Sequence, residues 1–218
     1  MTNLPENIIV EARDVSFSYP EEPDRHVLNN LNLQVCRGEC VAILGESGAG
    51  KTTLLKLLCG LLQPSQGQIL FEGKPLQGPR NDIALIFQNY GLFPWKTVRE
   101  NILLPAAIYE SSGPRDFAEE WIETLNIHHL KEVRAAELSG GELRRTAIAR
   151  TLCMQPPVIL ADEPTGDLDD ENTKLVFRCF RKAAEKNAAV PIVSHETDAL
   201  KFADHAFRMD GGVVTELM

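Results

Sequence analysis

Apolar residues recur along the chain with the two-residue period of strands. They alternate with polar residues at Leu31, Leu33 and Val35, and they cluster at 8–10, so we expect two early, half-buried antiparallel strands. The apolar run 41–44 has no polar interruption, which suits a central strand covered on both faces. Further strands are predicted at 69–71, 83–87, 158–161 and 190–194.

Helical periodicity appears in two places. Residues 52–58 predict a helix that packs back on the sheet and ends near Gly60. Between about 91 and 150 the pattern is mainly helical, and one face of a predicted helix there gathers Phe117, Trp121, Ile122 and Leu125. We therefore expect one domain, 1–218, with a mostly parallel α/β core (1–91 and 151–218) that includes an antiparallel β portion. An α-helical subdomain is inserted at 92–150, with a flexible lead-in at 111–114, and a hairpin turn is expected at 210–211.

Composition excludes several classes of protein. The net charge of −9 argues against nucleic-acid binding by general electrostatics. No apolar run reaches the length of a membrane span, and no basic segment precedes the first apolar residues as in a signal peptide. The odd number of cysteines, five, suits a reducing cytosol, and Cys36 and Cys40 lack the second pair that a zinc site requires.

A phosphate-binding loop follows the predicted central strand. Its glycines allow the backbone N–H groups to approach phosphate oxygens at the start of a helix. Lys51 would direct its charge to the β- and γ-phosphates, and the Thr52 hydroxyl would ligate Mg²⁺. The sequence matches G-x-x-x-x-G-K-[ST] over Gly45, Glu46, Ser47, Gly48, Ala49, Gly50, Lys51 and Thr52, and Thr53 follows it.

Two adjacent carboxylates, Asp162 and Glu163, end the predicted strand 158–161. Beside a phosphate loop, Asp162 is expected to hold Mg²⁺, and Glu163 is the candidate to orient or activate the attacking water. Without that loop, the two acids would be read as capping the turn at Pro164. The loop therefore decides the interpretation.

The segment 138–142, Leu-Ser-Gly-Gly-Glu, resembles the signature of ATP-binding cassette (ABC) ATPases. The other motifs resemble this family in its order along nearly the whole chain. The resemblance implies that Tyr19 stacks on the adenine, with Phe17 as the fallback. It implies that Gln88 binds Mg²⁺ and senses a membrane partner, and that His195 contacts the γ-phosphate. The segment 166–169 matches the D-loop of the family. Departures are Glu142 and Arg144, where many members have glutamine, and Asp167, where Ala or Asn is frequent.

The resemblance implies an ATP- and Mg²⁺-dependent ATPase that dimerises head-to-tail around two ATP, as a homodimer or with a paired ABC subunit. Ser139, Gly140 and Gly141 of one subunit would close over the ATP of the other. The enzyme would be cytoplasmic, bound to the inner face of the cell membrane through an integral membrane transporter subunit.

The group resembled most is that of lipoprotein release, macrolide efflux and division, on the segment 163–169 and the end 207–212. A nitrate/sulfonate-type importer is the alternative, since Phe93, Pro94 and Trp95 are similar to its segment. A soluble ABC ATPase and a nucleotide-gated scaffold are further alternatives.

Overall fold

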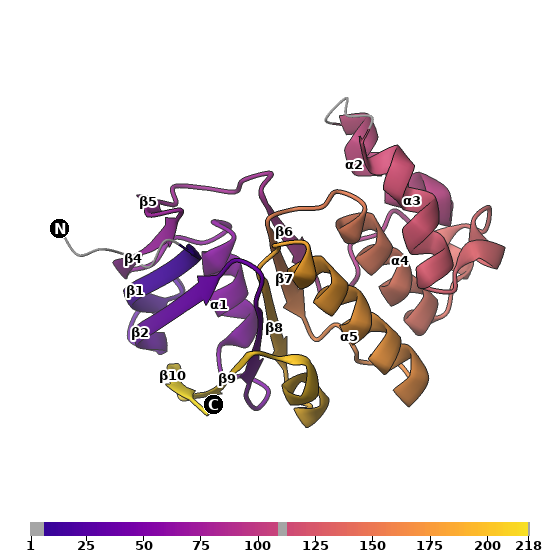
Figure 1. Cartoon of the computed structure of the whole chain (residues 1–218). Helices are drawn as coiled ribbons and strands as arrows, with labels where there is room; N and C mark the ends of the chain where they lie inside the picture. The colour runs from indigo at the N-terminus through magenta and orange to yellow at the C-terminus, as the bar shows by residue number, and fades with distance from the viewer. Residues whose placement is uncertain (1–6, 109–112, 218) are drawn as a thin grey trace.

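The computed structural model describes residues 7–108 and 113–217 and shows an α/β fold with two sheets (Figure 1). A four-stranded antiparallel sheet has the order β2 (His26–Cys36), β1 (Ile8–Ser18), β4 (Gln66–Phe71) and β5 (Lys74–Pro75). A six-stranded sheet has the order β10 (Val213–Glu216), β9 (His205–Asp210), β3 (Cys40–Leu44), β8 (Val190–Ser194), β7 (Val158–Asp162) and β6 (Ile83–Ile86). All its pairs are parallel except β9 with β10. The predicted α/β class with an antiparallel portion is confirmed.

Strand β3 is central, as predicted, because it pairs with β8 on one side and β9 on the other. Its side chains alternate between two hydrophobic clusters on opposite faces of the sheet. Cys40 and Ala42 belong to one cluster, and Val41 and Ile43 belong to the other. Helix α1 (Lys51–Leu58) contributes to the second cluster through leucines that are fully buried. Both faces of β3 are therefore covered, which explains its unbroken apolar sequence.

Helices occupy most of the segment 92–150, on one side of the molecule (Figure 1). They are α2 (Val98–Ile108), α3 (Gly113–Thr124), η1 (His128–Leu130), η2 (Ala135–Glu137) and α4 (Gly140–Leu152). The face predicted for α3 packs inward, with Trp121 and Ile122 buried and Phe117 partly buried. Residues 111 and 112 of the expected flexible lead-in lie outside the described residues.

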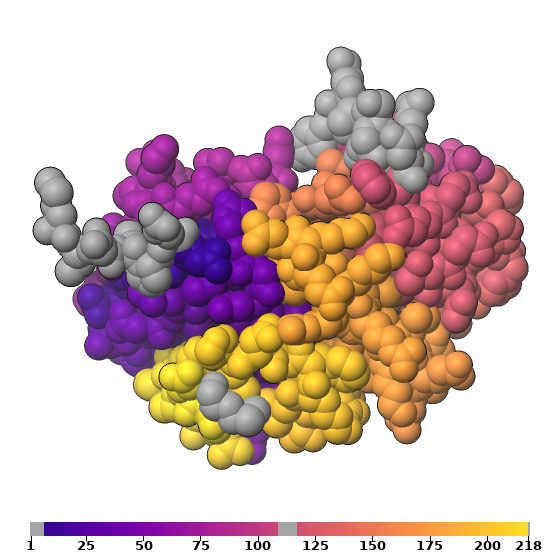
Figure 2. Space-filling model, in the orientation of Figure 1, coloured from indigo at the N-terminus to yellow at the C-terminus, as the bar shows by residue number. Residues whose placement is uncertain are grey.

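The last part of the chain returns to the core through α5 (Asp170–Glu185), β8, η3 (Thr197–Phe202) and β9. In the space-filling view this C-terminal segment lies against the N-terminal half, so residues distant in sequence are side by side (Figure 2). Within the described residues, no helix has the length and apolarity needed to cross a membrane.

Two sequence expectations require correction. The first strand is much longer than 8–10, because Ala12, Val15 and Phe17 stay buried while register shifts with β2 break the two-residue period. The predicted C-terminal hairpin exists, but its turn is Gly211–Gly212 rather than 210–211, because Asp210 pairs directly with Val213. Both turn glycines have positive φ, 52° and 79°, which favours glycine at these positions.

Candidate functional site

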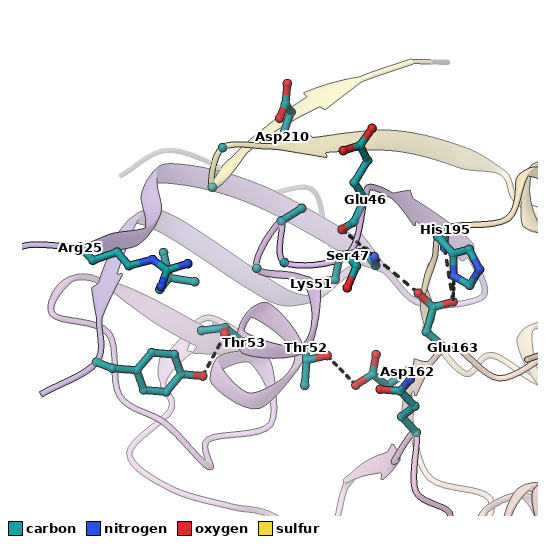
Figure 3. A pocket seen from close by; sticks show the side chains of 18 of the residues that line it. Arg25, Glu46, Ser47, Lys51, Thr52, Thr53, Asp162, Glu163, His195 and Asp210 are labelled. Atoms are coloured by element: carbon teal, nitrogen blue, oxygen red, sulfur yellow. Dashed lines mark hydrogen bonds and ion pairs between the residues drawn. The ribbon is translucent and has the colours of Figure 1, made fainter. Parts of the chain in front are cut away.

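Three parallel strands bring the predicted motifs to one edge of the six-stranded sheet. The phosphate loop follows β3, Asp162 is the last residue of β7, and Ser194 is the last residue of β8. In parallel α/β sheets the carboxyl ends of the strands form the ligand-binding edge. Motifs from three distant parts of the sequence therefore meet at one place (Figure 3).

The phosphate loop wraps around the side chain of Lys51, which is only 7% exposed. Its ammonium group donates to the carbonyl oxygens of Gly45 (2.7 Å) and Glu46 (3.1 Å). Gly50, just before α1, has a φ of 102°, and a Cβ there would lie 3.0 Å from the side chain of Leu28. The loop thus requires glycine at this position for both conformation and space.

Thr52 and Asp162 form a second contact at this edge, with the Thr52 hydroxyl donating to Asp162 Oδ2 at 2.8 Å. Burial raises the pKa of Asp162, while the hydrogen bond from Thr52 acts in the opposite direction. A buried carboxylate beside a hydroxyl offers the oxygen donors that Mg²⁺ prefers. No cluster of three or more His, Cys, Asp or Glu residues suited to a metal occurs among the described residues. The Thr52 hydroxyl and the Asp162 carboxylate fit a cation that also takes ligands from a bound phosphate.

Glu163 is the most connected side chain of the site. Its Oε1 lies 3.4 Å from the Lys51 ammonium. Its Oε2 accepts from the Ser194 hydroxyl at 3.1 Å and from the His195 backbone N–H at 3.3 Å, and lies 3.0 Å from His195 Nδ1. Figure 3 shows the carboxylate between the lysine and the histidine. The carboxylate is thereby held at the strand edge beside the phosphate loop.

These residues line a cavity of about 1320 Å³, ample for a nucleotide. Tyr19 and Gln88 line it as well, and the Tyr19 hydroxyl lies 3.0 Å from Thr53 Oγ1. Phe17, the fallback for Tyr19, is instead buried in the core. The predicted site residues that line this cavity are Tyr19, Glu46, Ser47, Gly48, Ala49, Gly50, Lys51, Thr52, Thr53, Gln88, Asp162, Glu163 and His195.

The signature residues lie apart from this group. Ser139, Gly140 and Gly141 begin α4 and do not line the cavity. Both the backbone N–H and the hydroxyl of Ser139 donate to Glu142 Oε2, at 2.8 Å each. These contacts lower the pKa of Glu142, the backbone N–H most strongly. The start of α4 is thus a capping box.

Sequence patterns do not predict two residues of the site, Ser194 and Arg144. The Ser194 hydroxyl binds Glu163 directly, and its position just before His195 at a strand end could have indicated this contact. Arg144 departs from the family pattern, and it lines the cavity and contacts the Glu163 carbonyl. That contact depends on how α4 packs and has no local sequence signal.

Comparisons with known proteins agree with this geometry. Residues 28–166 match the ABC transporter family. The chain is 35% identical, over 96% of its length and 99% of the relative's, to the lipoprotein-releasing system ATP-binding protein LolD of Anaplasma marginale (strain St. Maries). It is 34% identical to the bicarbonate transport ATP-binding protein CmpC of Synechococcus elongatus (strain ATCC 33912 / PCC 7942 / FACHB-805), over 94% of this chain but only 32% of that longer one.

A solved structure has the same fold. The ATP-binding cassette MJ0796, described as a dimer in a post-hydrolysis state bound to ADP and phosphate, superimposes with a TM-score of 0.85 at 28% identity. The alignment covers 96% of this chain and 99% of that one. From the site geometry and these matches, the chain belongs to the ABC transporter family, as an ATP-binding and ATP-hydrolysing subunit.

Proposed function

We propose that this chain hydrolyses ATP at the edge formed by β3, β7 and β8, to drive a separate membrane subunit of the export, release or division type. The observation that carries the proposal is the Glu163 carboxylate, held between Lys51 and His195 beside the phosphate loop. A carboxylate in that position is placed to orient or deprotonate a water that attacks a phosphate bound in the loop.

Each residue of the site has a proposed role. Lys51 and the loop N–H groups bind the β- and γ-phosphates, and Tyr19 stacks on the adenine. Glu163 acts as the general base, and His195 contacts the γ-phosphate. Mg²⁺, which neutralises charge between the phosphates when bound, would be held by Thr52, Gln88 and Asp162.

The signature supports a head-to-tail dimer. Ser139, Gly140 and Gly141 begin α4, where backbone N–H groups and the helix dipole favour an anion, but they do not line their own subunit's cavity. They would bind the γ-phosphate held by a second ABC subunit. ATP then stabilises the closed pair because both subunits contact it, and hydrolysis removes that bridge.

Exposed aromatic side chains offer a surface for the membrane subunit. Phe87 and Phe93 are each 38% exposed, and Trp95 is 67% exposed. Phe93 and Trp95 pack edge to face, with ring centroids 5.3 Å apart. Phe87 immediately precedes Gln88, which lines the cavity, so a partner that contacts Phe87 would lie close to a cavity residue. Such a partner would place this chain in the cytoplasm, on the inner face of the cell membrane.

The type of transporter is inferred from the relatives. This chain spans nearly the full length of LolD, which is named for lipoprotein release, but about a third of CmpC, which is named for bicarbonate transport. The match to LolD, at 35% identity, supports the release type together with the segment 163–169. An importer subunit remains the second candidate because the segment 93–95 is similar to that of nitrate and sulfonate importers.

The test is a pull-down of the tagged Glu163→Gln chain with ATP from detergent-solubilised membranes, with partners identified by mass spectrometry. A partner with few membrane spans and a large extracytoplasmic domain would support the proposal. A many-span permease with a solute-binding protein would favour the importer. If no membrane protein is captured although the ATP-bound dimer is intact, the soluble ABC ATPase becomes the leading interpretation. The same pull-down with Trp95→Ser added to Glu163→Gln tests the aromatic surface. This double variant is expected to bind ATP normally and to recover less of the partner.

A further inference from the structure

Arg144 is a buried arginine on α4 whose contacts converge on the turn that follows Glu163. It is 4% exposed, although it carries a charge. Its Nη1 donates to the carbonyl oxygen of Glu163, and its Nη2 lies 3.4 Å from Asp167 Oδ2. Its guanidinium carbon lies 5.1 Å from the centre of the Tyr90 ring. A buried guanidinium is stabilised by such multiple partners.

The turn that Arg144 contacts has an uncommon backbone. Glu163 and Asp167 both have φ in the left-handed region, 48° and 61°, although neither is glycine. Side-chain-bearing residues persist in that region when surrounding contacts fix them. Between them, a Cβ on Gly166 would lie 3.3 Å from Arg144 Nη2. The guanidinium therefore packs directly against the backbone of the turn.

Tyr90 and Arg150 extend this cluster to the segment that follows Gln88. The Tyr90 hydroxyl donates to Asp167 Oδ2 at 3.2 Å. Arg150, also on α4, donates to the carbonyl oxygens of Tyr90 (3.1 Å) and Gly91 (2.7 Å). Helix α4, which begins at the signature, thus contacts both the turn 163–167 and the segment 90–91.

We infer that Arg144 is a positioning residue for hydrolysis, and that it acts with Asp167 as a pair. The guanidinium fixes the turn 163–167 and thereby directs the Glu163 carboxylate toward Lys51 and His195. Arg144 and Asp167 are two of this chain's departures from the family pattern, and the structure places them in contact. The inference rests on the role proposed for Glu163. It adds that the signature helix controls the orientation of that carboxylate within the same subunit.

The test compares steady-state ATP hydrolysis by the full chain and its Arg144→Gln, Arg144→Lys, Asp167→Asn and Arg144→Gln/Asp167→Asn variants. Arg144→Gln is expected to lower kcat about 10- to 100-fold, as for a misplaced catalytic group, with the KM for ATP changed less than about threefold. Arg144→Lys should recover part of kcat, because it keeps the charge but not the paired donors. The double variant should be no slower than Arg144→Gln, because the two residues act together. Arg178→Gln, an exposed arginine on α5, is the matched control with wild-type kcat.

Glu163→Gln is measured in parallel to separate the two hypotheses. If it retains turnover, the role proposed for Glu163 fails. If it loses turnover while Arg144→Gln keeps wild-type kcat, or loses only thermal stability or ATP affinity, the inference about Arg144 is overturned. Should Arg144→Gln fail to fold, Asp167→Asn decides, since the Asp167 side chain is 68% exposed and tolerates substitution. The kcat of Asp167→Asn should fall by about threefold or more. A wild-type kcat would overturn the inference that Arg144 and Asp167 act as a pair.

Discussion

At the scale of single residues, two adjacent carboxylates receive different environments. Asp162 is 5% exposed and faces the Thr52 hydroxyl, and burial raises its pKa. Glu163 turns the other way, toward the Lys51 ammonium and His195. Asp162 is the last residue of β7, and Glu163, just beyond it, has a positive φ of 48°. Different surroundings let neighbouring acids take different roles, and the roles proposed here are a cation ligand for Asp162 and a base for Glu163.

Replacing the proposed base isolates its contribution. Glu163→Gln keeps the size of the side chain but cannot accept a proton, so kcat should fall by about 10²- to 10⁴-fold, the usual contribution of a general base. ATP affinity should change little, because the phosphate loop is intact. Phosphate release and equilibrium ATP binding measure the two effects. Equal turnover by both proteins would remove Glu163 from its proposed role.

At the scale of elements, the sequence pattern predicts the motifs at the ends of strands but not the contacts between elements that are distant in the sequence. Lys51, Asp162 and His195 each follow an apolar run, and the carboxyl ends of parallel strands must meet, so their convergence was predictable. The Arg144 contacts depend on the packing of α4 against the turn 163–167, which no local pattern encodes. The full length of β1 was missed because register shifts disturb its alternation. The subdomain boundaries at 91/92 and 150/151 stay predictions.

One ion pair joins three elements at the other end of the sheet. Asp204 lies just before β9. Its Oδ2 accepts a hydrogen bond from the Cys40 backbone N–H at the start of β3 (2.9 Å) and pairs with the Arg181 side chain of α5. The hydrogen bond from Arg181 is the main cause of the lowered pKa of Asp204, and the Cys40 N–H adds to it. The ionised carboxylate therefore stabilises the folded state relative to the unfolded one.

This predicts a pH-dependent loss of stability in Asp204→Asn. At pH 7 the free energy of unfolding should fall by about 1 kcal/mol, reduced by partial exposure of the pair. Since the folded pKa is depressed, the stabilisation is present above the ordinary value of 3.8 and is lost as pH falls through the folded value. Urea unfolding from pH 7 to 3 measures the difference. A difference in stability that persists unchanged at pH 3 would contradict this explanation. As a control, Asp198→Asn, which removes a surface ion pair with Lys201, should change stability by less than about 0.5 kcal/mol.

At the scale of the whole molecule, the helical side and the sheet share one hydrophobic core. A single cluster includes Ile102 and Trp121 from the helices together with Phe177 and Ile192 from α5 and β8. Helix α4, which begins at the signature, packs into this core, but the signature residues themselves do not line the cavity. We therefore propose that a second ABC subunit completes the site by contributing its signature.

The most direct test is size-exclusion chromatography with light scattering of Glu163→Gln, with and without Ser139→Arg, in the presence of ATP. Glu163→Gln should form a dimer with ATP, because it binds ATP and hydrolyses it too slowly to separate. Glu163→Gln/Ser139→Arg should stay monomeric while still binding ATP, because the arginine would obstruct the signature facing the other subunit's nucleotide. If the double variant dimerises as well as Glu163→Gln, the role of the signature across the dimer is wrong.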